Sequence, residues 1–150
     1  MASSSGGRAP LSGARTKARR AALDLLFESE QRGLNAGTLL AERMTKPVAE
    51  TPLRGYTVEI VDGVVEHWQR INEVLGTYSQ GWPVERMPAV DRAILRVGAW
   101  EVLYNSDVPD AVATQQAVEL ATALSTDESP SFVNGLLSRL SEVKNTLDLT

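Results

Sequence analysis

The sequence contains no cysteine and a single histidine, His67. These counts exclude disulfides, thiol nucleophiles, cysteine-based zinc sites and metal sites built on two or more histidines. Every hydrophobic run is interrupted by Asp, Glu, Arg, Gly or Pro before it reaches the roughly 18–20 residues that a membrane span requires. We therefore expect a cytoplasmic protein that uses no metal and no cofactor and makes no membrane contact.

Motifs that carry catalysis are also missing. The sequence has no nucleophile elbow, no phosphate-binding glycine loop with its lysine, and no dinucleotide-binding glycine pattern. His67 lies within a helical periodicity and has no neighbouring nucleophile, which favours a packing or surface histidine over a catalytic base. The 19 carboxylates follow polar helix faces, and nothing in the sequence pairs two of them. We expect a binding protein, not an enzyme.

Charge is distributed unevenly along the chain. The first 20 residues carry five bases and no acid, whereas the rest of the chain has a formal charge of −9. Four of these bases, Arg15, Lys17, Arg19 and Arg20, stand close together, and we call them the basic arm. Such a distribution fits a polyanion at the arm and a basic partner elsewhere, and it equally fits a solvated tail.

The hydrophobic period is helical from Ala14 onward, and no segment alternates as a strand would. Residues 1–13 are rich in Ser, Gly and Ala, which predicts a disordered extension before a single all-α domain at 14–150. Gly33 is placed to cap the first helix, and Ser129 with Pro130 to begin the last. The predicted helices are 14–32, 36–44, 56–78 with a break near His67, 89–104, one that carries Ala113 to Leu124, and one from Ser129 to Val143.

Two residues stand out from this helical pattern. Gly63, inside a helix, costs about 1 kcal/mol relative to alanine, which suggests that another helix approaches closely there. Phe132 lies off the apolar stripe of the last helix, so it is predicted to be an exposed ring on which a base could stack. The alternative, that its ring folds against the neighbouring helices, is equally compatible with the sequence.

Three blocks of sequence form a recognisable set: Ala89–Val97 with Trp100-Glu101, then Asp107-Val108-Pro109 with Ala117–Ala121, and finally Ser129–Leu137 with its Phe-Val-Asn-Gly run. In this order and spacing, the blocks resemble the NusB family of bacterial transcription antitermination factors. With a weaker match over Ala14–Arg32, the resemblance covers about residues 14–145. It implies an all-α fold of about seven helices in two packed sub-bundles, at about 14–79 and 80–145, without enzymatic activity.

The resemblance also implies a function. Members of the family bind the boxA segment of ribosomal RNA leader transcripts, usually together with NusE, which is also a protein of the small ribosomal subunit. The pair is delivered to the RNA polymerase antitermination complex and supports the synthesis and processing of ribosomal RNA. Some members self-associate, so both a monomer and a homodimer are compatible with the resemblance.

Residues are assigned from the resemblance by position. RNA contacts are expected at the basic arm, Arg15, Lys17, Arg19 and Arg20, and at the loop before the last helix, with Glu128, Ser129 and Phe132. The surface that faces NusE is expected to contain Phe27, Gln31, Glu85 and Asp91. The chain departs from the family at Thr16, where an arginine would strengthen the arm, and at Phe27, where a tyrosine is familiar.

Two alternative functions compete with this one. A NusB-like module also occurs in ribosomal RNA methyltransferases, but 150 residues leave no room for their cofactor-binding domain, so this alternative would need a longer reading frame. The other alternative is a helical protein-interaction adaptor or self-associating dimer without an RNA role, with the arm as a solvated tail.

Overall fold

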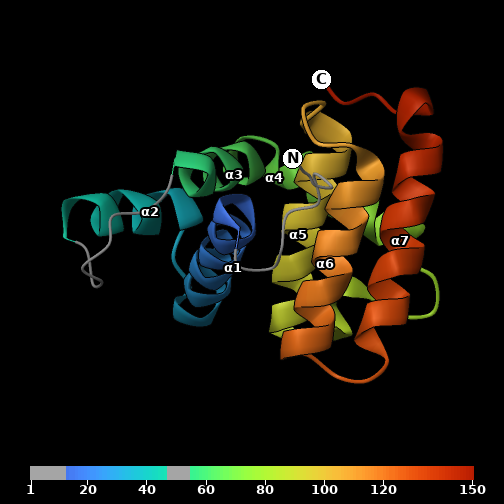
Figure 1. The fold of residues 1–150 in the computed structure, drawn as a ribbon, viewed down its shortest axis with the longest axis horizontal. Coiled ribbons are helices and arrows are strands. Elements are labelled where there is room, and N and C mark those ends of the chain that lie inside the picture. Colours follow the sequence, from blue (N-terminus) through green and yellow to red (C-terminus); the bar gives the residue numbers. More distant parts are fainter. Residues whose placement is uncertain (1–12, 47–54) are drawn as a thin grey trace, which may run out of the picture.

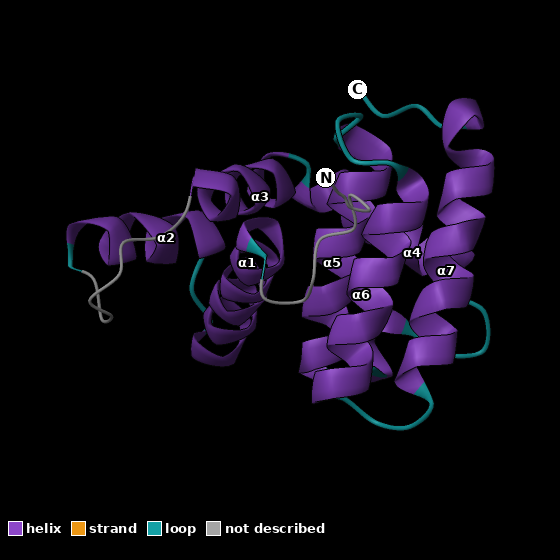
Figure 2. Cartoon of the chain, in the orientation of Figure 1, coloured by secondary structure: helices purple, strands orange, loops and turns teal. Residues whose placement is uncertain are grey.

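The structure is a computed structural model, which describes residues 13–46 and 55–150. Within these residues it is entirely helical, with seven α-helices and two short 3₁₀ turns and no strand (Figure 2). The expectation for residues 1–13 lies almost wholly outside the described residues. The elements are α1 (Ala14–Arg32), α2 (Ala36–Thr45), α3 (Gly55–Glu66), α4 (Trp68–Tyr78), η1 (Val84–Arg86), α5 (Ala89–Tyr104), α6 (Asp110–Leu124), α7 (Ser129–Val143) and η2 (Lys144–Thr146).

The helices form two packed sub-bundles. In the first, α1 packs against α2 and α3, and in the second, α5, α6 and α7 lie side by side (Figure 1). Helices α1 and α3 both contact α5, which therefore joins the two groups. Helix α4 contacts α3 but also α5 and α7, so it packs on both sides of the boundary that the sequence placed near residue 79. That exact boundary stays a prediction.

Several helix ends follow the predicted signals. Gly33 takes φ 68°, and Leu34 N–H then donates to the Ser29 carbonyl at 2.8 Å, which closes α1. The long periodic segment breaks at His67, whose ring stacks on Tyr104 with centroids 3.7 Å apart. Both predictions are confirmed, and His67 is a packing residue.

The start of α7 differs from the prediction. The residue that precedes the helix is Glu128, whereas Ser129 is already helical and caps nothing with its side chain. Its hydroxyl instead donates to Asp91 Oδ2 at 2.7 Å. The predicted Ser129 cap is therefore wrong, because the hydroxyl is turned into the protein toward a carboxylate from α5.

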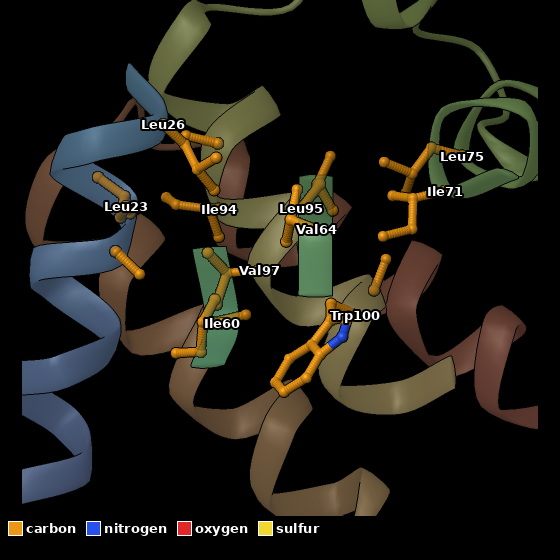
Figure 3. Close-up of a cluster of buried hydrophobic side chains, with 14 of the residues drawn as sticks. Leu23, Leu26, Ile60, Val64, Ile71, Leu75, Ile94, Leu95, Val97 and Trp100 are labelled. Carbon is orange, nitrogen blue, oxygen red and sulfur yellow. The ribbon is translucent and has the colours of Figure 1, made fainter. Parts of the chain in front are cut away.

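The core is built around α5, whose residues from Ala93 to Leu103 are all buried. Aliphatic side chains from α1, α3, α4 and α5 converge here, and the Trp100 ring lies among them (Figure 3). A Cβ atom at Gly63 would come within 2.0 Å of the Trp100 indole nitrogen, so the absence of a side chain lets α3 approach α5. The close contact predicted at Gly63 is confirmed.

None of the helices in the described residues is both long enough and apolar enough to span a bilayer.

Candidate nucleic-acid interface

Three of the four cations of the basic arm lie on the surface of α1. Arg15, Lys17 and Arg20 are exposed within its first two turns. The Arg15 guanidinium lies 4.4 Å from the Tyr56 ring centroid, and Arg20 Nε reaches Asp24 at 3.3 Å in an exposed pair. Lys17 forms no ion pair with any residue that the structure describes. An exposed surface pair contributes little, so all three cations remain available to an external anion.

Arg19 is placed differently from its neighbours. Only 4% of it is exposed, and its Nε donates to both carboxylate oxygens of Glu101 at 3.0 and 2.9 Å. The sequence grouped Arg19 with the RNA-contacting cations, but the structure places its guanidinium in the interior. There it joins α1 to α5, because a buried carboxylate such as Glu101 requires a charged partner.

Tyr56, Asn105 and Gln116 complete the network around Arg19. The Tyr56 hydroxyl donates to Glu101 and accepts from Asn105 Nδ2 at 3.0 Å. Burial, with the Glu101 charge as a second cause, raises the pKa of the Tyr56 hydroxyl well above its ordinary value, so it stays a donor. Gln116 Oε1, from α6, accepts a longer bond from Arg19 Nη1 at 3.4 Å. The network fixes the first turns of α1 against three other helices.

Thr16 belongs to the network around Arg19 as well. It is buried, and its hydroxyl donates to Gln116 Oε1 at 2.8 Å. The position where an additional arginine was expected to strengthen the arm therefore faces α6. A long cation at residue 16 would have to displace this contact to reach the surface.

The loop before α7 holds the second predicted group. Glu128 is exposed, Ser129 is fully buried, and Phe132 is half-buried with its ring edge-on to Trp82 at a centroid distance of 5.0 Å. The Phe132 ring thus keeps some exposed surface, although it packs against the loop after α4. The sequence left open an exposed ring and a ring packed against its neighbours. The structure shows features of both, because the ring contacts Trp82 and is also partly exposed.

The residues predicted to face NusE divide in the same way. Phe27 is 38% exposed, and Gln31, one turn later on α1, is exposed too, as is Glu85 in η1. Asp91 is fully buried and accepts hydrogen bonds from Ser125 and Ser129. Asp91 therefore ties the α6–α7 loop to the start of α5 and presents no surface to a partner.

A second ion-pair network, which the sequence did not predict, holds η1 against the end of α1. We call it the Glu30 joint. Arg92 Nε donates to both oxygens of Glu30 at 3.0 Å, and its Nη1 donates to the Val84 carbonyl at 3.3 Å. Arg96 adds a bond to Glu30 at 3.3 Å and lies over the Trp68 ring at 4.4 Å. Hydrogen bonds from Arg92 hold the pKa of Glu30 below its ordinary value. The joint fixes the loop that carries Glu85. The only sign of it in the sequence was the presence of Arg92 and Arg96 inside the most apolar segment of the chain.

Among the described residues, no three His, Asp or Glu side chains gather closely enough to hold a metal ion. Exposed cations lie at the start of α1, and the exposed Phe27 and Gln31 lie toward its other end, against which Arg92 holds η1 with Glu85.

The NusB family model matches residues 16–142. The chain belongs to the NusB family. The transcription antitermination protein NusB of Beutenbergia cavernae is 60% identical over 135 residues, which cover 85% of this chain and 88% of that protein. The protein of the same name from Kineococcus radiotolerans is 59% identical over 134 residues, or 89% of this chain and 97% of the relative.

Solved structures of NusB proteins share the fold. T. maritima NusB superposes with a TM-score of 0.74 at 28% identity, covering 90% of this chain and 99% of the other. A crystal structure of the antitermination factors NusB and NusE in complex with double-stranded RNA gives a TM-score of 0.73 at 25% identity, with 86% of this chain and 96% of that chain covered. The predicted family and the predicted all-α fold in two sub-bundles are confirmed.

Proposed function

We propose that this chain is a transcription antitermination factor that binds boxA RNA of ribosomal RNA leader transcripts together with NusE. The observation that carries the proposal is the placement of Arg15, Lys17 and Arg20: they are exposed on a helix whose position is fixed by the buried Arg19–Glu101 pair. Cations held on a rigid element offer phosphates a defined path without the cost of ordering a flexible tail.

The family supports the identity of the two ligands. A relative of this fold has been solved with NusE and RNA, and relatives at 60% and 59% identity are named as antitermination proteins. The chain acts as a non-enzymatic, cytoplasmic adaptor for the RNA polymerase antitermination complex and so supports the synthesis and processing of ribosomal RNA.

The RNA surface runs from the exposed cations of α1 to the α6–α7 loop, where Glu128 is available to base edges and the Phe132 ring to a stacked base. Arg19 and Ser129 act through their neighbours, because both are buried: Arg19 positions α1, and Ser129 positions the loop. NusE is assigned to the face that carries Phe27, Gln31 and Glu85, where the exposed Glu85 carboxylate suits a basic ribosomal protein.

The test is binding of a boxA RNA and of a scrambled RNA of equal length, each with and without NusE. We expect tighter binding of boxA RNA and a further gain when NusE is present. Lys46→Ala, which removes an exposed cation at the end of α2, is the matched control and should leave both affinities unchanged. Equal affinity for the two RNAs in the presence of NusE contradicts the proposal. If the chain then self-associates in light scattering, a dimeric adaptor without an RNA role explains it better.

A further inference from the structure

A hollow of about 270 Å³ opens between the first two turns of α1 and the outer face of α6. Its volume lies just below the roughly 300–1,000 Å³ of pockets that hold drug-sized molecules, which suits a single flat ring with its sugar. None of its charged residues takes part in the buried hydrogen-bond network around Arg19 and Glu101. It is lined by Thr16, Lys17, Arg20, Glu119, Leu120 and Ala123.

The wall of this hollow carries charges of both signs. Lys17 and Arg20 stand on the α1 side, and Glu119 stands opposite them on α6. Neither Lys17 nor Glu119 forms an ion pair with any residue in the described ranges. The lining also includes Leu120 and Ala123, which offer apolar contact. The hollow thus combines two phosphate-binding cations, one carboxylate acceptor and an apolar surface.

The two helices that form the walls of the hollow are held in place by hydrogen bonds. The hydroxyl of Thr16, which lines the hollow, donates to Gln116, about one turn before Glu119 on α6. Because Gln116 also accepts from Arg19, the relative position of α1 and α6 is fixed by buried hydrogen bonds. The geometry of the hollow is therefore preformed in the absence of a ligand.

This chemistry matches one unstacked nucleotide of single-stranded RNA. Lys17 and Arg20 suit its phosphates, Leu120 and Ala123 suit the face of its base, and Glu119 suits a donor on the base edge. A basic peptide is a poorer ligand, because the two cations would repel the charge that Glu119 attracts.

The carboxylate also restricts which base is accepted. An ionised carboxylate only accepts hydrogen bonds, and in base recognition it pairs with exocyclic amino groups such as that of cytosine. Cytosine, adenine and guanine carry an amino group on the pairing edge. Uracil offers only N3–H there, between two carbonyl oxygens, and these oxygens repel a carboxylate that approaches this donor. We propose that Glu119 is a specificity-determining residue, and that this hollow takes one amino-bearing base of the RNA whose binding is proposed above.

The test compares an eight-nucleotide uridine RNA with the same RNA carrying one central cytidine, because uridine tracts stay unstacked. The wild-type chain should bind the cytidine-containing RNA more tightly by about fivefold or more, the lower end of discrimination by a specific base contact. In Glu119→Gln, which keeps the shape but can also donate, the preference should fall below about twofold. Affinity for the uridine RNA should hold or rise, since a negative charge near phosphates is removed.

Glu42→Gln is the matched control, because it removes one exposed carboxylate from α2, which lies on the far side of α1 from α6 (Figure 1). It should keep the full cytidine preference. A preference that survives in Glu119→Gln, or is absent from the wild type, overturns the role of Glu119. If boxA RNA is still preferred over scrambled RNA in that case, the proposed function stands and the hollow alone is refuted. If boxA RNA and scrambled RNA also bind with equal affinity, the proposed function fails as well.

Discussion

Arginines gather at both ends of α1, and at its C-terminal end they come from α2 and α5 as well as from α1 itself. The two sets are engaged differently. At the C-terminal end, Arg32 and Arg43 bind Glu28, while Arg92 and Arg96 bind Glu30, so each of these cations has a carboxylate partner. At the N-terminal end only Arg19 is committed to a buried partner, and Arg15, Lys17 and Arg20 face solvent. Cations paired between helices hold those helices together. Exposed cations with no buried partner, including Arg20 in its exposed pair with Asp24, are left for an anion that the protein itself does not supply.

The largest effect on stability is expected at Arg19. Arg19→Ala leaves Glu101 buried without its cation, which should cost about 3–5 kcal/mol of unfolding free energy. Urea denaturation measures the loss. Arg20→Ala, one residue later but in an exposed pair, should cost less than about 1 kcal/mol. Equal losses of unfolding free energy in the two variants would contradict the distinction between the buried, structural Arg19 and the exposed Arg20.

A smaller loss is expected at the opposite end of the helix. Arg92→Ala removes hydrogen bonds to Glu30 and to the carbonyls of the η1 loop, at a cost of about 1.5–3 kcal/mol. Because this loop carries Glu85, NusE affinity should fall as well. The control is Arg86→Ala, an exposed change in the same turn, which should leave stability unchanged. If the Arg92 variant is destabilised but binds NusE with normal affinity, η1 is not part of the NusE-binding surface.

The Glu30 joint also predicts a pH dependence. The pKa of Glu30 lies below its ordinary value of 4.5 in the folded chain, chiefly because of Arg92. Its stabilising contribution is therefore complete above pH 4.5 and is lost as the pH falls through the lower folded value. The difference in urea midpoint between the wild type and Glu30→Gln should be largest near pH 7 and should narrow below pH 4.5. A difference that stays constant down to pH 3 would show that the charge of Glu30 is not what matters.

The sequence predicts the helices better than it predicts the roles of individual polar residues. The period of apolar residues and the Gly33 and His67 signals are local, so the bounds of α1 and the break between α3 and α4 follow directly. The roles of Arg19 and Asp91 depend on partners 82 and 38 residues away, which no local pattern specifies.

Some signals for these roles were nevertheless present. Arg19 lies four residues before Leu23 and seven before Leu26, on a face that is buried, and Glu101 interrupts the apolar run of α5. Polar residues on two buried faces must find partners, so a search for such matches could have paired Arg19 with Glu101. The Glu119 hollow gave no comparable signal, because it exists only where α1 and α6 come together.

The most direct test of the central claim is the salt dependence of boxA RNA binding. Three exposed cations, at about 0.7 released counterion for each phosphate of a single strand, predict a slope of log K against log salt near −2. The triple variant Arg15→Ala, Lys17→Ala, Arg20→Ala should have a slope near zero. Arg32→Ala, which removes an exposed cation in a similar i,i+4 pair at the opposite end of α1, should keep the wild-type slope. A triple variant that retains the slope, or an Arg32 variant that loses it, would contradict the assignment of the exposed cations at the start of α1 to RNA.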